Sequence, residues 1–162
     1  SLLPFIKTLE SSHKLISECS ECGNVDMTNP CNICLNSNRD NKSICIIEDV
    51  SDLWTFERAG VYSGLYHVLG GSLSAISGVG IEELSINKLL KRIKNKEIKE
   101  VILALSTTME GQTTSHVIAD KLESFKDLIV TRLAQGIPIG GEVHYLDENT
   151  LNTAFQSRKK II

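Results

Sequence analysis

The chain has 162 residues, 41% of them hydrophobic, and a formal charge of −3 at neutral pH. That length and apolar content suit one domain of ordinary size with a small appendage, and they exclude a largely disordered chain. Mild acidity argues against a protein that coats nucleic acid by bulk charge, so any such contact must use local patches.

The amino-acid composition of the N-terminal third changes along its length. Residues 1–17 show the apolar spacing of a helix, with the Ser11-Ser12 pair as a candidate interruption. Residues 18–42 are polar and hold four of the five cysteines. Residues 44–47, Ile-Cys-Ile-Ile, form a short apolar run that is typical of a strand buried on both faces. Ser51 is expected to cap the next helix, which stops at Gly60.

The rest of the chain alternates between strand and helix patterns. The expected elements are a strand over 65–69, a helix from about Ser85, a strand over 100–105, a helix over 114–125, a strand over 128–133 and a short helix toward Phe155, capped by Asp147 or Asn149. This alternation predicts an α/β fold with a mostly parallel sheet flanked by helices. No apolar run reaches the roughly 20 residues that cross a membrane, and no secretory leader opens the sequence.

Four cysteines form two Cys-x2-Cys pairs separated by eight residues: Cys19, Cys22, Cys31 and Cys34. Tetrahedral Zn²⁺ takes four thiolates, and a two-residue spacing lets one tight turn deliver two of them. The segment has too few apolar side chains to fold alone, so the metal would supply the missing stability. Disulfides or free thiols are the alternatives. Because four thiolates fill the coordination sphere, the predicted zinc is structural, and Cys45 is expected to be a core residue.

Acidic residues follow two of the predicted strands. Glu48 ends the 44–47 strand, and Glu110 follows the 100–105 strand after a polar loop. If the two strands are neighbours in a parallel sheet, both residues lie on the rim where such sheets bind ligands, and paired carboxylates there could hold Mg²⁺. Asp49 and Asp52 fit better as acids at a helix start, which the helix dipole favours.

An ordered set of motifs resembles a known family. Ile46-Ile47-Glu48 and Leu103-Ala104, followed after five residues by Glu110-Gly111, are similar to the Toprim domain of topoisomerases, primases and repair proteins. With the cysteines in front, the order resembles the RecR family of bacterial recombination mediators. Further matches lie at 30–34 with Arg39, 64–71, 73–74, 78–80, 132–142 and 146–151, so the resemblance covers about residues 15–157. It implies a helical remnant over 1–17, a four-cysteine zinc finger over 18–42, a Toprim domain over 43–142 and a C-terminal segment over 143–162.

The resemblance implies a mediator instead of an enzyme. Enzymatic Toprim domains carry Asp-x-Asp-x-Glu-Gly, whereas Ser106 and Thr108 stand at the two aspartate positions here. A neutral hydroxyl is a weaker ligand, so Mg²⁺ is expected to bind poorly. In the family these acids dock RecO, a partner with RecF, so Glu48, Glu110 and Gly111 are predicted as a partner-binding or residual acidic site.

The resemblance also implies a homo-oligomer that encircles DNA and a helix-hairpin-helix DNA-binding segment before the cysteines. Residues 1–17 correspond at most to the trailing helix of that segment, and the first residue is Ser1. We therefore expect a trimmed chain whose DNA contact relies mainly on the missing part. The expected location is the bacterial cytoplasm, in association with the nucleoid and without membrane contact.

One predicted helix has a basic face. Lys88, Lys91 and Arg92 are expected on the arc opposite the apolar positions 86, 89, 90 and 93, as candidate phosphate contacts. A solvated helix face is the alternative. The histidines share no spacing with the cysteines or a carboxylate and are expected to be structural or exposed: His13, His67, His116 and His144.

The sequence therefore predicts a non-catalytic mediator of DNA recombination and repair that loads recombinase on gapped DNA with RecF- and RecO-type partners. A Mg²⁺-dependent Toprim-type nuclease or topoisomerase fragment, with the metal at Glu48 and Glu110, is the alternative. A zinc-dependent protein-interaction module without DNA contact is a third reading.

Overall fold

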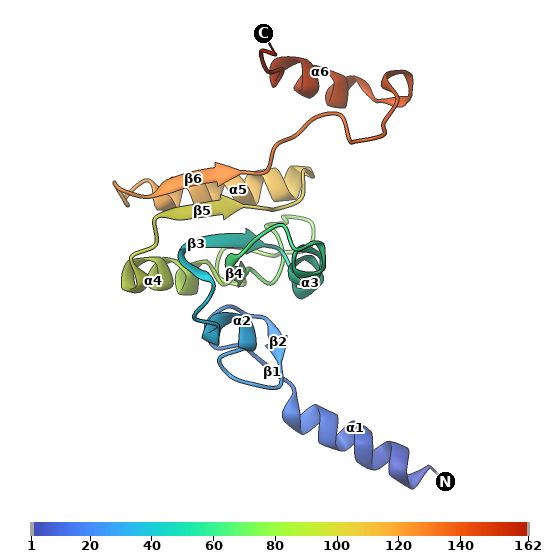
Figure 1. Ribbon diagram of the computed structural model, residues 1–162, viewed down its shortest axis with the longest axis vertical. Helices are drawn as coiled ribbons and strands as arrows, with labels where there is room; N and C mark the ends of the chain where they lie inside the picture. The colour runs from blue at the N-terminus through green and yellow to red at the C-terminus, as the bar shows by residue number, and fades with distance from the viewer. Residues whose placement is uncertain (1, 162) are drawn as a thin grey trace. The chain divides into compact units, whose positions relative to one another are not determined.

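The computed structural model describes residues 2–161, so Ser1 and Ile162, the outermost residues of the predicted terminal segments, lie outside the described part. Helices and strands alternate along most of the chain, as Figure 1 shows. They are α1 (Leu3–Leu15), β1 (Ser17–Glu18), β2 (Val25–Asp26), α2 (Asn32–Leu35), β3 (Asp40–Ile47), α3 (Val50–Ala59), β4 (Gly64–Val68), α4 (Ile86–Lys96), β5 (Glu100–Leu103), α5 (Met109–Leu122), β6 (Ile129–Arg132), the 3-10 turn η1 (Val143–Tyr145) and α6 (Glu148–Gln156). Between Thr131 and Arg132 the chain divides into two compact units.

A four-stranded sheet organises the first unit. Its strand order is β4-β3-β5-β6, and β3 pairs in parallel with both of its neighbours. Ile44 at the centre of the sheet lies opposite Leu65 of β4 and Val101 of β5. The last five residues of β3 are all buried, as the continuous apolar run indicates. The predicted α/β fold with a mostly parallel sheet is confirmed.

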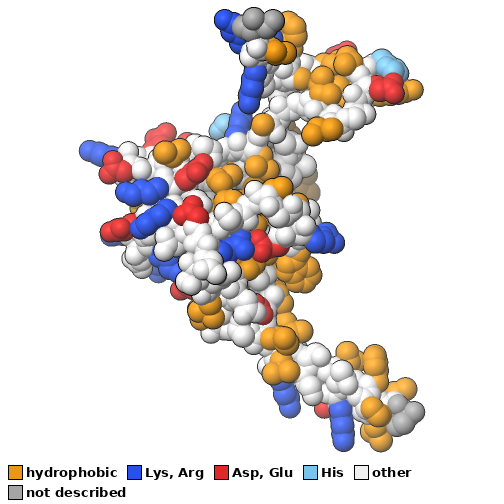
Figure 2. Space-filling model, in the orientation of Figure 1, with side chains coloured by type: hydrophobic (Ala, Val, Ile, Leu, Met, Phe, Trp, Pro, Cys, Tyr) orange, Lys and Arg blue, Asp and Glu red, His pale blue; other side chains and the backbone are white. Residues whose placement is uncertain are grey.

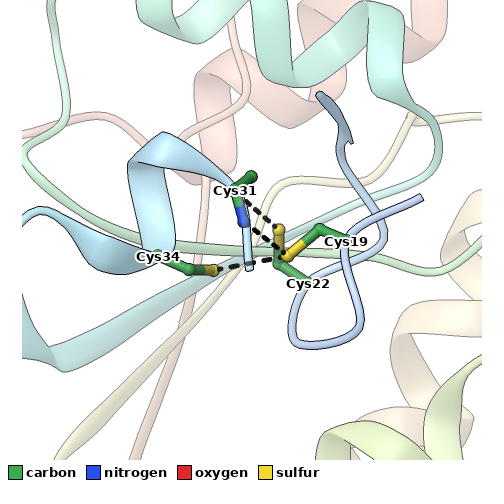
Figure 3. Close-up of side chains that lie close together, drawn as sticks. All are labelled: Cys19, Cys22, Cys31 and Cys34. Carbon is green, nitrogen blue, oxygen red and sulfur yellow. Dashed lines mark hydrogen bonds between the residues drawn. The ribbon is translucent and has the colours of Figure 1, made fainter. Parts of the chain in front are cut away.

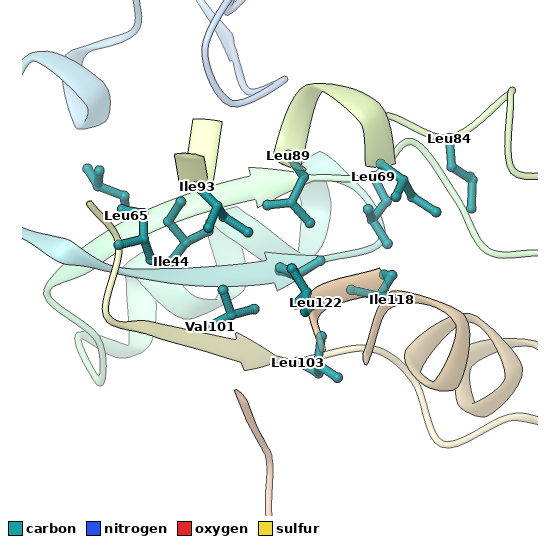
Figure 4. Close-up of a cluster of buried hydrophobic side chains, with 13 residues drawn as sticks. Ile44, Leu65, Leu69, Leu84, Leu89, Ile93, Val101, Leu103, Ile118 and Leu122 are labelled. Carbon is teal, nitrogen blue, oxygen red and sulfur yellow. The ribbon is translucent and has the colours of Figure 1, made fainter. Parts of the chain in front are cut away.

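The two faces of β3 belong to different hydrophobic clusters, because successive side chains of a strand point to opposite faces. Ile44 and Ile46 pack with side chains of α4 and α5, as Figure 4 shows for Ile44. Cys45 and Ile47 pack with Leu53 of α3. Helices α4 and α5 therefore cover one face of the sheet and α3 the other. Burial raises the pKa of the Cys45 thiol to about 12, and its prediction as a core residue is confirmed.

Helix α3 begins at a different cap from the predicted one. The Asp49 carboxylate accepts from the backbone N–H groups of Ser51 and Asp52, at 2.7 and 3.3 Å, and the Asp52 carboxylate accepts from the Asp49 N–H. This reciprocal capping box makes Asp49 the N-cap, so the prediction of Ser51 is wrong. The prediction that Asp49 and Asp52 are helix-start acids is confirmed, and Gly60 ends the helix at φ 63°.

Helix α5 begins five residues before its predicted start at Thr114. The Thr108 hydroxyl accepts from the Gly111 N–H at 3.1 Å and caps the helix, so Glu110 lies in its first turn and not in a polar loop. Position 111 lies inside the helix and requires glycine, because the Cβ of any other residue would collide with the carbonyl oxygen of Ser106. A glycine that signals a loop in the sequence here permits close packing of a helix.

The terminal helices follow their local sequence signals. Helix α1 runs unbroken through the two serines, and the Ser11 hydroxyl donates to the Lys7 carbonyl oxygen at 2.8 Å. Asp147 caps α6 by accepting from the Thr150 N–H at 3.0 Å, which decides between the two predicted caps. Over residues 2–161, none of the helices has both the length and the apolarity that crossing a membrane requires.

Candidate zinc centre and acidic rim

The four cysteine sulfurs of residues 19–34 converge. All lie within 4.8 Å of one another, and Figure 3 shows the four side chains close together. Sγ of Cys22 is 3.5 Å from Sγ of Cys31, and Sγ of Cys19 is 4.0 Å from Sγ of Cys34. A tetrahedron with zinc–sulfur bonds of about 2.3 Å has sulfur–sulfur edges of about 3.8 Å. The cluster therefore has the donor type, number and spacing that Zn²⁺ requires.

Two short local structures deliver the cysteine pairs. Cys19 and Cys22 lie in the turn between β1 and β2, which the Gly23 N–H closes by donating to the Cys19 carbonyl oxygen at 3.0 Å. Gly23 has φ 80°, a conformation that suits glycine. Cys31 is the N-cap of α2, and Cys34 lies within that helix. A tight turn and a single helical turn thus place all four sulfurs.

Three N–H groups point at the sulfurs. The Cys31 N–H donates to Sγ of Cys19 at 3.2 Å, and the Asn24 N–H donates to Sγ of Cys22 at 3.4 Å. The Arg92 guanidinium donates to Sγ of Cys34 at 3.5 Å. Such donors stabilise thiolate over thiol and fix the direction of each sulfur, as the outer partners of metal ligands do. They fit a site whose sulfurs are deprotonated by a metal.

Arg92 packs against this zinc module (residues 18–42) instead of facing water. Only 5% of the residue is exposed, and the guanidinium donates to the Tyr66 carbonyl oxygen of β4 at 2.5 Å as well as to Cys34. Arg92 therefore does not belong to a solvated helix face, which was the alternative to phosphate contact. Periodicity places a residue on a helix face but does not reveal a neighbour from another part of the chain, and a buried carbonyl and thiolate require a donor.

The other two residues of the predicted basic face differ from each other. Lys88 is half-buried, and its Nζ donates to the Cys19 carbonyl oxygen at 3.3 Å. Lys91 is exposed. Next to them, Lys96 pairs with Glu21 at 2.7 Å, and the hydrogen bond from Lys96 lowers the pKa of the Glu21 carboxyl. Helix α4 thus holds the zinc module with basic side chains, and phosphate contact by Lys88 and Lys91 stays a prediction.

The two strands that precede the acidic residues are parallel neighbours, which is the condition under which Glu48 and Glu110 share a rim. Glu48 directly follows β3 and Glu110 lies in the first turn of α5, after β5, so both occupy the rim at the carboxyl ends of two neighbouring strands. Glu48 Oε1 accepts from the Ser106 N–H at 2.8 Å and from the Ser106 hydroxyl. Among residues 2–161, the four cysteines are the one group of three or more Cys, His, Asp or Glu side chains whose ligand atoms converge.

His67 is one of the histidines that the sequence left open as structural or exposed, and it is structural. It is fully buried in β4, and its Nε2 lies 3.0 Å from both the carbonyl oxygen and the hydroxyl of Ser85. Burial lowers the pKa of the ring to about 4, so it is neutral at pH 7. The sequence holds a signal for this burial. His67 lies two residues from both Leu65 and Leu69, so the alternation of a strand places it on the same face as these two apolar residues.

Comparison with known families extends over nearly the whole chain. Residues 16–36 match the zinc finger domain of RecR, which is defined by four cysteines, residues 42–134 the Toprim domain and residues 136–159 the RecR C-terminal model. A protein named Recombination protein RecR from Erythrobacter litoralis is 50% identical over 161 residues, which are 99% of this chain and 81% of the relative. The chain belongs to the RecR family. A RecR of Brucella anthropi is 50% identical over 157 residues, covering 97% of this chain and 78% of that relative.

Membership confirms the resemblance that the motifs indicated. The RecR zinc-finger match and the converging sulfurs identify the four cysteines as a structural zinc site. The α/β sheet with its flanking helices is the Toprim domain of this family. The relatives are recombination proteins, and the chain accordingly has a role in DNA recombination and repair.

Proposed function

We propose that this RecR-family chain is a non-catalytic mediator that acts with RecO- and RecF-type partners to load recombinase on gapped DNA. The observation that carries the proposal is the bond between Glu48 and Ser106. The carboxylate that an enzymatic Toprim site would use for metal here accepts the N–H and the hydroxyl of Ser106. These two hydrogen bonds occupy lone pairs of the Glu48 carboxylate that a metal would need, and the Ser106 hydroxyl brings no negative charge to attract Mg²⁺.

The other groups on the rim are also engaged in holding the fold. The Thr108 hydroxyl, at the second aspartate position of the enzymatic pattern, caps α5. Asp49 and Asp52 form the capping box of α3. Glu110 and the second oxygen of Glu48 remain available at the carboxyl-end rim of the sheet, and Gly111 allows α5 to approach Ser106 closely. We assign these three residues to partner docking.

The remaining parts of the proposal follow from the family. The chain acts as a homo-oligomer on DNA in the bacterial cytoplasm, in association with the nucleoid. Zinc finger, Toprim domain and C-terminal segment take residues 18–42, 43–142 and 143–162, after a helical segment over 1–17. DNA contact relies mainly on a helix-hairpin-helix segment of the kind that precedes the cysteines in the family.

Partner binding tests the docking assignment. The variant Glu48→Ala/Glu110→Ala is expected to weaken binding to a RecO-type partner by at least tenfold and to slow recombinase assembly on gapped DNA coated with single-strand-binding protein. Glu123→Ala, an exposed acid near the far end of α5, is the matched control. Unchanged partner binding by the double variant contradicts the docking role.

A nicking assay addresses the enzymatic alternative. Supercoiled DNA is incubated with the chain and Mg²⁺, and the proposal expects no cleavage above the background of the Glu48→Gln variant. Cleavage that Glu48→Gln abolishes would establish the Toprim-type enzyme and overturn the mediator.

A further inference from the structure

A hollow of about 180 Å³ lies between α4 and the zinc-binding turn of residues 19–22. Its lining includes Lys88, Lys91 and Asn95 of the helix and Ser20 and Glu21 of the turn. At about 30 Å³ for each water molecule, the hollow holds roughly six waters, which is enough room for a phosphate group. Both walls consist of side chains that donate hydrogen bonds, apart from Glu21.

The helix that forms one wall has a charge opposite to that of the chain. Helix α4 contains five basic residues and no acidic one. Because the whole chain carries −3, the rest of it carries −8. On the flank that α4 occupies in Figure 1, Figure 2 shows Lys and Arg side chains interspersed with acidic ones, so the positive charge belongs to the helix and not to the whole flank. The positive charge is therefore concentrated on one element.

Part of this charge already has partners within the protein. Lys96 pairs with Glu21, and two nitrogens of Arg92 donate to Tyr66 and Cys34. The Arg92 Nε is buried, has no hydrogen-bond partner and lies 3.9 Å from a Glu21 oxygen. The guanidinium that carries this buried donor lines the hollow, and its positive charge favours an anion there.

Lys88 and Lys91 supply the charge that remains available at the hollow, since Lys94, which is also exposed, lies outside its lining. Lys88 uses one of its three N–H groups on the Cys19 carbonyl oxygen, and this contact holds the ammonium at the edge of the hollow. Among the described residues, none forms a hydrogen bond or ion pair with the Lys91 ammonium, and the side chain is exposed. The Asn95 amide and the Ser20 hydroxyl add uncharged donors.

We propose that this hollow binds a phosphate of a nucleic-acid backbone, an inference that rests on the proposed role of the chain on DNA. Lys88, Lys91 and Asn95 stand at positions i, i+3 and i+7 of one helix, so they form a stripe about 10 Å long. A stripe of donors fits successive phosphates of a polyanion better than one small anion. The lining holds no aromatic side chain for base stacking, so the contact is independent of sequence.

Fluorescence anisotropy with labelled oligonucleotides of mixed sequence tests the site on the zinc-loaded chain. Lys91→Glu is expected to weaken binding by about tenfold and to lower the slope of log affinity against log salt by about 1. Ser20→Glu, which places a negative charge in the hollow from the zinc module, is expected to have a similar effect. Lys94→Glu is the matched control: it makes the same charge change on the same helix, at an exposed residue outside the hollow.

Three results overturn the site. The first is an equal loss of DNA affinity in Lys91→Glu and Lys94→Glu, and the second is no DNA binding by the unaltered chain. The third is that polyglutamate or inorganic phosphate displaces the labelled oligonucleotide as effectively as unlabelled DNA does. Zinc content and circular dichroism establish that each variant is folded. Recombinase loading in the same preparations separates the two proposals. If recombinase loading is normal but Lys91→Glu leaves the DNA affinity unchanged, only this phosphate site is overturned. If Lys91→Glu weakens DNA binding but the unaltered chain does not support loading, only the mediator function is overturned.

Discussion

His67 is buried between β4 and the start of α4, and its surroundings hold the ring in the neutral form. Burial is the largest cause of the lowered pKa, and the nearby charges of Arg92 and Lys88 act in the same direction. The contact with the Ser85 carbonyl oxygen uses the proton on Nε2, and Nδ1 has no partner. A second proton would therefore be buried beside two cations.

The free energy of unfolding should depend on pH through His67. The folded pKa of about 4 lies below the unfolded value of about 6.5, so the unfolded chain binds a proton first as the pH falls. Stability is then complete above pH 6.5 and decreases between pH 6.5 and 4, by an upper limit of roughly 3 kcal/mol. Urea unfolding of the zinc-loaded chain at pH 7, 6 and 5 measures this loss.

His67→Gln provides the comparison, because its amide can donate to Ser85 and does not titrate. Its stability should change less than that of the unaltered chain between pH 7 and 5. The difference between the two proteins removes the contributions of zinc release and of carboxylates. Parallel pH dependences in the two proteins would show that His67 does not titrate in this range.

At the scale of elements, α4 connects the sheet to the zinc module. One face of the helix contributes Ile86, Leu89 and Ile93 to the core, and the adjacent edge contributes Arg92 and Lys88 to the zinc module. The stem of a long basic side chain can pack along an apolar surface while its charged end reaches a polar neighbour. Arg92 and Lys88, which lie next to the core face of α4, can therefore reach the zinc module with their charged ends.

Replacement of Arg92 should loosen the metal. Arg92→Met keeps a long apolar stem but removes the donors to Tyr66 and Cys34, and loss of an outer partner of a metal ligand typically costs about 10- to 100-fold in metal affinity. We expect zinc transfer to a chromophoric chelator to be about tenfold faster. Lys94→Met on the exposed side of α4 is the control, and equal rates for the two variants would contradict this bracing role.

Element boundaries were predictable where local chemistry decides them. The buried run of β3 follows from a few neighbouring residues, and the same kind of local signal limited the cap of α6 to Asp147 or Asn149, of which the structure has Asp147. The start of α5 was missed because Gly111 normally marks a loop, and the reason for a glycine there is the carbonyl of Ser106, which is brought close only by the fold. The zinc ligands were predictable because their spacing is local, whereas the partners of Arg92 lie 26 and 58 residues away.

At the scale of the whole molecule, the described residues contain two kinds of core: apolar clusters around the sheet, and a small cluster around the zinc-binding cysteines. The sheet and its helices share large apolar clusters of Ile, Leu and Val. The zinc module has a small cluster of its cysteines with Ile33, and its strands β1 and β2 are two residues long. Little apolar area is buried there, so the metal must supply most of its folding free energy.

Removal of zinc should therefore unfold one part of the chain and leave the other largely intact. After chelation under reducing conditions, hydrogen exchange detected by mass spectrometry should show loss of protection over residues 19–34. Protection should persist over 44–47 and 101–103, at the centre of the sheet. Loss of protection in both regions at the same chelator concentration would show that the metal sustains the entire fold.

The carbonyl and N–H groups on the outer side of β4 have a consequence for solubility. Strand β4 ends the sheet, yet the Gly64 and Tyr66 carbonyl oxygens accept from Arg39 and Arg92, and the Val68 N–H donates to the Cys22 carbonyl oxygen at 2.7 Å. An uncovered edge strand invites pairing with the strands of other molecules. The metal-bound turn and the two arginines thus occupy the place where another polypeptide would add to the sheet, so loss of zinc is expected to expose part of this edge and to promote aggregation.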